Sequence, residues 1–304
     1  MSSLSLFDEN GGGFFSNVVS PWKEAAAYEA LWSEKGASFK KIADKFRDQN
    51  GLLPSDLVSE GTVQAYIKAL QDNFQIYRDK EFGVSVFGTV EYPDKLRDAA
   101  NPLELLYYQG SWDLIYSPAV AIVGSRKPSE EGTRRARKLA YGLINDGYTI
   151  VSGLAEGIDT AAHEAAIEHK GQTIGVIGTS LAHAYPKKNQ SLQDKIRDEY
   201  LLISQVPFMV YESQDYRMNR SFFPQRNVTM SAITEATIIV EASDTSGTLY
   251  QARAALAQGR KLFILESCFQ NPSITWPKKY VAKGAVRVKD YSDIRTALDV
   301  HKSI

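Results

Sequence analysis

The chain has 304 residues but only one cysteine, Cys268. A single cysteine excludes a disulfide within the chain and a zinc site built from several thiolates, and a chain of this length without disulfides is typical of a reducing compartment. No run of about 18 apolar residues is present, so we expect no membrane-spanning helix. Residues 1–16 lack the basic stretch and the long apolar stretch of a secretory signal peptide. These absences predict a cytoplasmic protein.

Neither sign of charge is in excess, because Lys+Arg is 35 and Asp+Glu is 36, a formal net charge of -1. This balance excludes a globally basic nucleic-acid binder. A local basic patch remains possible, since net charge carries no information about where the charges lie. The hydrophobic share of 43% and the charged share of 23% are typical of a folded globular protein.

The N-terminal part of the chain predicts three successive units. Residues 1–20 are rich in Ser, Gly and Asn and predict a flexible tail. Residues 21–85 carry apolar side chains at helical spacing and predict a small helical domain that packs against its neighbour. A winged-helix or SAM-like arrangement is the alternative for this segment. Residues 86–304 form the third and largest unit.

From about Val120 onward, short apolar runs alternate with helical stretches. The expected strands are 120–124, 148–153, 173–178, 201–206, 237–242 and 261–265. The expected helices are 130–145, 159–169, 189–200, 227–235 and 248–258. Ser129 and Asp159 are expected to cap the first two of these helices. Strict alternation with continuously apolar strands predicts an α/β fold, a doubly wound parallel sheet of Rossmann-like type with helices on both faces.

The loops that follow the predicted strands carry the candidate site. In a doubly wound sheet, ligands bind at the carboxyl ends of the strands, where glycine turns and helix N-termini present free amides to anions. Arg126, Lys187, Lys188 and Arg226 add positive charge at the same end of the sheet. We therefore expect a concave phosphate-binding surface with no catalytic residue, cofactor or metal. Its candidate residues are Gly124, Ser125, Arg126, Ser152, Gly153, Gly157, Lys187, Lys188, Asn189, Arg226, Asn227, Ser246, Gly247 and Thr248.

Each cation also has a purely structural interpretation. Arg126 either contacts phosphate or pairs with Glu130 or Glu131, and Arg226 either contacts phosphate or braces the turn at Pro224.

The lysines and aromatics of the same loops have two interpretations as well. Lys187 and Lys188 either contact phosphate or form a solvated turn. The aromatic side chains of Tyr185, Phe222 and Phe223 either stack on bases, as in proteins that bind single strands, or pack in the core.

The motifs in these loops resemble one known family. VAIVGSR, IVSGLAEGIDTAAH, TIGVIGT, FFPQRN and VEASDTSGTLYQARAALAQGR, with the lead-in EYPDKL, are similar to the DNA-processing protein A (DprA/Smf) family over 92–298. The resemblance implies an extended Rossmann-like domain that binds single-stranded DNA and dimerises. It also implies a partner, a RecA-type recombinase that the protein helps to load during DNA uptake and recombination. It implies binding rather than catalysis.

The resemblance assigns roles residue by residue. Arg126 matches the arginine of the family's Gly-Ser-Arg turn, and Arg226 and Asn227 match the start of its Arg-Asn-Arg signature. The third position of that signature is Val228, and Glu266 and Ser267 replace a common Pro-Gly turn. The remaining matches are Ser152, Gly153, Gly157 and Asp159 in the Ser-Gly loop, Lys187 and Asn189 in the Tyr-Pro-x-x-Asn loop, and Ser246, Gly247 and Thr248 in the Ser-Gly-Thr turn.

Two alternative functions remain open at this stage. Phosphoribohydrolases of the same superfamily use a glutamate at the position of Gln251, and an amide cannot act as a base near neutral pH. The other alternative is a sensor of a small nucleotide-derived ligand, which would occupy the same loops.

Overall fold

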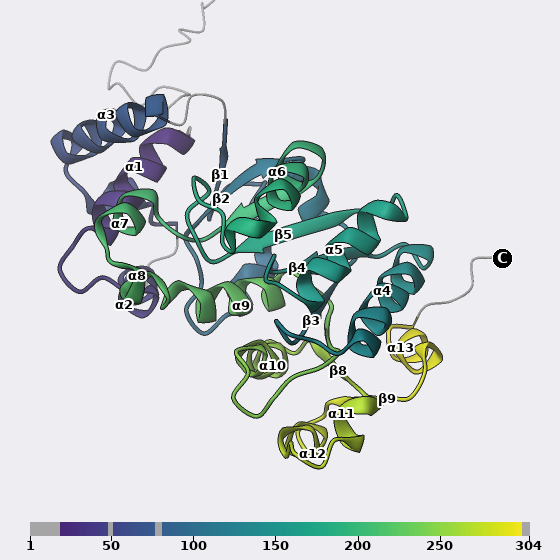
Figure 1. The fold of residues 1–304 in the computed structure, drawn as a ribbon. Helices are drawn as coiled ribbons and strands as arrows, with labels where there is room; N and C mark the ends of the chain where they lie inside the picture. Colours follow the sequence, from purple (N-terminus) through teal and green to yellow (C-terminus); the bar gives the residue numbers. More distant parts are fainter. Residues whose placement is uncertain (1–18, 48–50, 77–80, 300–304) are drawn as a thin grey trace, which may run out of the picture.

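The computed structural model describes residues 19–47, 51–76 and 81–299 (Figure 1). Its central feature is a sheet of nine strands in the order β1-β2-β6-β5-β4-β3-β7-β8-β9. The strands are β1 (Gly83–Val86), β2 (Leu105–Gly110), β3 (Ala119–Val123), β4 (Thr149–Ser152), β5 (Thr173–Ile177), β6 (Leu201–Ser204), β7 (Ala236–Ile239), β8 (Lys261–Leu265) and β9 (Val286–Val288). The predicted tail over 1–20 lies, apart from Val19 and Ser20, outside the described residues.

The six predicted strands are confirmed as β3 to β8, and neighbours among them run parallel. Three further strands extend the sheet at its two edges. At one edge β2 pairs antiparallel with both β1 and β6, and at the other β9 adds three residues parallel to β8. The α/β doubly wound fold is therefore confirmed, with a mixed edge that the sequence pattern did not predict.

Helices cover both faces of this sheet (Figure 1). One face carries α4 (Glu130–Asn145), α5 (Ile158–Glu168) and α6 (Gln190–Glu199), and the other carries α9 (Phe222–Ala232) and α10 (Thr248–Ala257). The apolar core lies between these helices and the strands, with Ile122, Leu143 and Phe263 fully buried. None of the helices in the described ranges has the length and apolar character needed to cross a membrane.

Two helix starts differ from the sequence prediction. Helix α5 begins at Ile158 with Gly157 as its N-cap, so Asp159 lies inside the first turn and is not the cap. Helix α9 begins at Phe222, five residues before the predicted start at 227, and includes Pro224. A proline is accommodated there because the first amides of a helix have no partner within the helix. Ser129 is confirmed as the cap of α4, since its Oγ accepts a hydrogen bond from the Gly132 amide at 2.9 Å.

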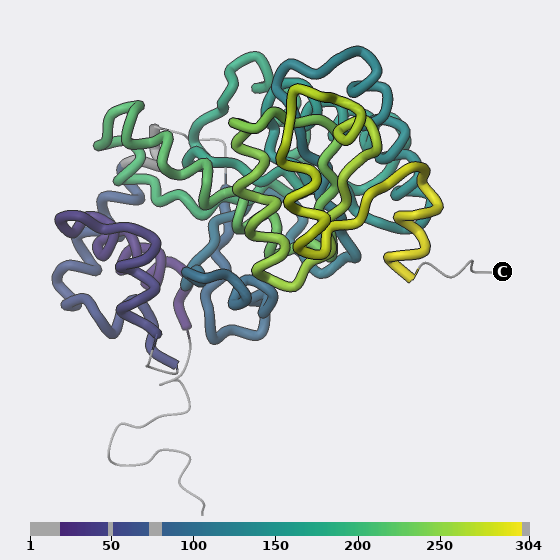
Figure 2. The backbone as a smooth tube through the Cα atoms, turned by 90° about the horizontal axis from the view of Figure 1, so that it is seen from below, coloured from purple at the N-terminus to yellow at the C-terminus, as the bar shows by residue number. Residues whose placement is uncertain are grey.

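The N-terminal helices lie at one end of the molecule and the C-terminal elements at the opposite end (Figure 2). The N-terminal group comprises α1 (Pro21–Trp32), α2 (Phe39–Phe46), the 3-10 turn η1 (Pro54–Leu57) and α3 (Glu60–Ile76). The helical character predicted for this segment is confirmed, and β1 after it joins the large sheet. The remaining short elements are α7 (Phe208–Ser213), α8 (Tyr216–Asn219), α11 (Glu266–Gln270), α12 (Trp276–Val281), α13 (Tyr291–Ala297), η2 (Asp94–Asp98), η3 (Trp112–Tyr116) and η4 (Lys187–Asn189).

Candidate functional site

A cleft of about 540 Å³ opens at the carboxyl ends of β3 and β7. These strands are neighbours, while the connection through α4 takes the chain from β3 to β4 on the other side. This reversal of strand order is where ligands bind in open α/β sheets. The predicted residues that line the cleft are Gly124, Ser125, Arg126, Arg226, Asn227, Ser246, Gly247 and Thr248.

A smaller hollow of about 40 Å³ adjoins the cleft and shares Arg126, Ala155, Phe223 and Arg226 with it. Its other wall includes Tyr185, whose ring meets the Phe223 ring edge-on at a centroid distance of 5.5 Å. Tyr185 is 39% exposed, whereas Phe222 is buried among core aromatics. Of the three predicted stacking residues, only Tyr185 and Phe223 therefore lie beside the cavities.

Arg226 is buried on the floor of the cleft and is held by backbone carbonyls. Its guanidinium donates hydrogen bonds to Gly153 O and to Val176 O, the latter at 3.0 Å, and its Nε donates to Asn227 Oδ1 at 2.9 Å. Burial lowers the pKa of Arg226, opposed by the nearby Asp159 carboxylate. An arginine nevertheless stays protonated in proteins. Arg226 is therefore both a structural brace and a fixed positive charge beneath the cleft.

Three exposed cations surround the cleft: Arg126 and Lys127 from the loop after β3, and Arg220 from the turn between α8 and α9. Within the described ranges none of the three forms an ion pair with a carboxylate, so the predicted alternative for Arg126 is not seen. Glu131 pairs instead with Arg134 and Arg135. These cations are consequently available to a ligand.

Sequence reasoning missed Lys127 and Arg220. The signal for Lys127 was its position directly after Arg126, inside the same loop. Arg220 lies two residues before the FFPQRN motif, and only the fold of α8 and α9 brings it to the cleft.

The loop at Lys187–Asn189 lies outside both cavities. Lys188 forms an ion pair with Glu156 at 2.6 Å, and Lys187 is exposed. Asn189 is buried and donates to Leu154 O and Thr160 Oγ1, both at 2.9 Å. These contacts make Asn189 a link between two loops.

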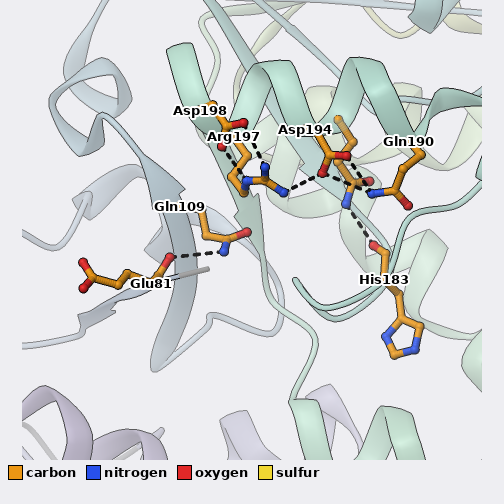
Figure 3. A network of polar contacts seen from close by, with 8 residues as sticks. Glu81, Gln109, His183, Gln190, Asp194, Arg197 and Asp198 are labelled. Atoms are coloured by element: carbon orange, nitrogen blue, oxygen red, sulfur yellow. Dashed lines mark hydrogen bonds and ion pairs between the residues drawn. The ribbon is translucent and has the colours of Figure 1, made fainter. Parts of the chain in front are cut away.

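Helix α6 contacts the loop at 178–186, which precedes Lys187, through a polar network that includes His183 (Figure 3). Gln193 donates a hydrogen bond to His183 O at 2.9 Å. Within α6, the partly buried Arg197 bridges Asp194 and Asp198 (Figure 3). The loop is therefore fixed on the helix that follows it.

Ser152, Gly153 and Gly157 shape the loop backbone. The Ser152 hydroxyl is buried and donates to Ile122 O at 2.7 Å. A Cβ on Gly153 would lie 1.9 Å from Arg226 Nη1, so this glycine makes room for the arginine side chain. Gly157 adopts φ +80°, and a Cβ there would lie 2.4 Å from Ser125 O. Both glycines serve close packing between loops.

Protein amides hold the acidic side chains near the cleft, apart from Glu156 of the smaller hollow, which pairs with Lys188. Burial raises the pKa of Asp159, whose Oδ2 accepts from the Ala155 amide at 3.4 Å. Glu241 accepts from the Ser129 amide and hydroxyl, and Asp244 accepts from the Thr275 and Trp276 amides. The carboxylates thereby support the loops, and the exposed charged side chains that line the cleft itself are positive.

The position of Gln251 bears on catalysis. Its side chain lines the cleft, is buried, and donates from Nε2 to Thr237 Oγ1 at 3.2 Å. An amide held in this way supplies neither a general base nor a nucleophile. In the described part of the chain, no group of three or more His, Cys, Asp or Glu side chains is arranged to hold a metal ion.

Residues 83–299 match the family model described as DNA recombination-mediator protein A. The chain belongs to this family. The match confirms the resemblance predicted over 92–298 and begins at Gly83, the first residue of β1. Val228, at the family's third signature position, does not line the cleft in this member.

Individual relatives agree with the family assignment. The chain is 32% identical to DNA processing protein DprA of Bacillus subtilis (strain 168) over 233 residues. The aligned residues make up 76% of each chain. The X-ray structure of DNA processing protein A from Streptococcus pneumoniae matches with a TM-score of 0.71 and 27% identity, over 91% of this chain and 98% of that one.

A solved structure of DNA processing protein A from Helicobacter pylori matches with a TM-score of 0.60 and 27% identity, over 72% of this chain and 97% of that one. That work describes the single-stranded DNA binding mode of the H. pylori protein. These matches confirm the fold of the family for this chain.

Proposed function

We propose that the chain binds single-stranded DNA across the cleft at β3 and β7, without catalytic turnover. The observation that carries this proposal is the set of three exposed cations, Arg126, Lys127 and Arg220, around a cleft whose floor holds the fixed charge of Arg226. Phosphates neutralised by such cations release counterions, which makes the affinity fall steeply with salt. The binding mode studied for the H. pylori relative supports the same ligand class.

Sequence-tolerant binding follows from the chemistry of the cleft. The side chains beside it include the exposed cations, the aromatic pair of Tyr185 and Phe223, and the exposed ring of Tyr250. Cations suit phosphates, and aromatic rings suit base faces.

The family supports a second step in this proposal. We propose that the bound strand is passed on to a recombinase of the RecA type, a step that the family's description as recombination mediators supports. We further propose a homodimer in the cytoplasm as the working form. Sedimentation of the full chain with and without oligothymidine tests the dimer.

The test of DNA binding is fluorescence anisotropy of labelled oligothymidine with the full chain at two salt concentrations. Arg126→Glu, Lys127→Glu and Arg220→Glu should each weaken DNA binding. Each should also make the slope of log affinity against log salt concentration shallower by about 1, the contribution of one phosphate contact. Lys40→Glu is the matched control, because Lys40 is an exposed cation on α2 that pairs with Asp44. The affinity of Lys40→Glu for oligothymidine should stay at the wild-type level.

Two results would contradict the proposal. Unchanged affinity in all three cleft variants would place the DNA elsewhere. Displacement of oligothymidine by a mononucleotide at equal concentration of phosphate would favour a small nucleotide-derived ligand in the cleft.

A further inference from the structure

A buried carboxylate connects the N-terminal helices to the segment that leads to the cleft. Glu29 of α1 is completely buried and accepts three hydrogen bonds. The donors are the Tyr107 hydroxyl on β2 at 2.7 Å, the Phe208 amide at 2.8 Å and the Met209 amide at 3.0 Å. The last two form the first turn of α7, so the acid of α1 fixes where α7 begins.

The other end of the same segment is also fixed by the N-terminal helices. Phe222, the first residue of α9, lies with its ring centroid 6.0 Å from Trp32 and 5.9 Å from Phe39. Segment 208–222 is therefore attached to α1 at both ends and to α2 at Phe222. Arg220 lies within this segment and lines the cleft. Phe223, which also lines the cleft, is the first residue after the segment.

The physical chemistry of Glu29 makes this contact costly to remove. A buried carboxylate loses its hydration and is tolerated only where donors surround it. Removal of the acid would leave two backbone amides and one hydroxyl without a partner in the interior. Burial also raises the pKa of Glu29 to about 7, against the hydrogen bonds that lower it.

We propose that Glu29 is a positioning residue, through which the N-terminal helices hold segment 208–222 and thereby place Arg220 and Phe223 at the cleft. The DNA part of this inference rests on the proposed function. The N-terminal helices then act as a brace for the site of the larger domain. Glu29 itself does not contact the cleft.

The chain offers a matched control on the same helix. Glu24 of α1 is also buried, at 2% exposure, and accepts from the Ser55 amide at 2.9 Å and the Ser55 hydroxyl at 2.8 Å. Both partners of these bonds belong to the N-terminal helices. Glu24→Ala therefore disturbs the helical group without releasing α7.

The experiment measures two properties of full-length Glu29→Ala, Glu29→Gln and Glu24→Ala, all well below their melting temperatures. The first is amide hydrogen exchange across 208–222, which needs no DNA. The second is oligothymidine affinity. Glu29→Ala should speed exchange in 208–222 and weaken DNA binding about tenfold, because only the fraction of molecules with the segment in place is competent to bind. Glu29→Gln keeps one acceptor oxygen, so its exchange rate and its DNA affinity should lie between those of wild type and Glu29→Ala. It also provides a folded variant if Glu29→Ala does not fold.

The outcomes separate this inference from the proposed function. If 208–222 exchanges at the wild-type rate in both Glu29 variants, or if Glu24→Ala speeds it equally, the brace is wrong. If exchange rises as expected but no form of the protein, wild type included, binds DNA, the brace stands and the proposed function fails. If exchange rises while affinity stays unchanged, the segment is held by Glu29 but does not position the DNA site.

Discussion

At the scale of single residues, the loops around the cleft depend on glycines that admit other parts of the protein. Gly157 combines φ +80° with a backbone oxygen, Ser125 O, at 2.4 Å from where a Cβ would lie. The conformation alone costs a non-glycine residue about 1–3 kcal/mol, and the contact cannot be relieved by rotating a side chain. The turn carrying Arg126 would shift if this contact were forced.

Gly157→Ala should accordingly lower the free energy of unfolding by about 2–3 kcal/mol, measured by urea denaturation. Gly247→Ala is the control, because Gly247 has no positive φ and nothing within 4 Å of the point where an alanine methyl group would lie. Its effect should stay within about 0.5 kcal/mol. If the two variants lost equal free energy of unfolding, the positive φ and the close contact with Ser125 O would not determine the cost of the Gly157 substitution.

At the scale of elements, the first turn of α4 organises the loop that carries the exposed cations. Ser129 Oγ accepts from the Gly132 amide at 2.9 Å and donates to Glu241 Oε2 at 3.0 Å. The cap thus joins α4 to the segment after β7, across the two sides of the cleft. A cap of this kind contributes more than its helix-terminal hydrogen bond alone.

Ser129→Ala should destabilise the protein by about 1–2 kcal/mol in thermal or urea unfolding. Ser38→Ala offers the comparison, since Ser38 caps α2 through a single hydrogen bond from the Lys41 amide at 3.3 Å. Its loss should be smaller. A loss at Ser38 that matched or exceeded the loss at Ser129 would argue against the bridging role of Glu241.

At the scale of the whole molecule, attachment of the N-terminal helices should depend on pH. The pKa of Glu29 is about 7 in the folded chain and near 4.5 when unfolded, because burial disfavours the charged form. Between these values the folded chain binds more protons, so this group's stabilisation is complete below about 4.5 and is lost as pH rises through 7. Tyr28, Tyr107 and Glu104 are the other ionisable groups that face this region.

The measurement is urea unfolding of wild type and Glu29→Gln between pH 5 and 8. The difference in stability, wild type minus variant, should fall with rising pH by at most about 1.4 kcal/mol per pH unit. Subtraction removes the titration of Glu104 and the exposed acids, since both proteins share them. A difference independent of pH would show that Glu29 does not titrate in this range.

Much of the fold was predictable from local pattern. Strands β3 to β8 are continuous apolar runs, and a parallel sheet buried on both faces requires that composition. Strand β2 was missed because its residues include Tyr108 and Gln109 with no regular alternation, and β9 because it has only three residues. The start of α9 was missed because a proline, here Pro224, is more typical of a turn than of a helix.

The sequence by itself determined the chemistry available at the carboxyl ends of the strands, because strand, loop and helix follow one another locally and their apolar periodicity is strong. Only the tertiary structure decided which of those residues face outward. It buries Arg226 and Asn189 in contacts with segments distant in sequence, pairs Lys188 with Glu156, and brings Arg220 to the cleft. Partners in such contacts lie tens of residues apart in the sequence, so the local spacing of residues cannot predict them.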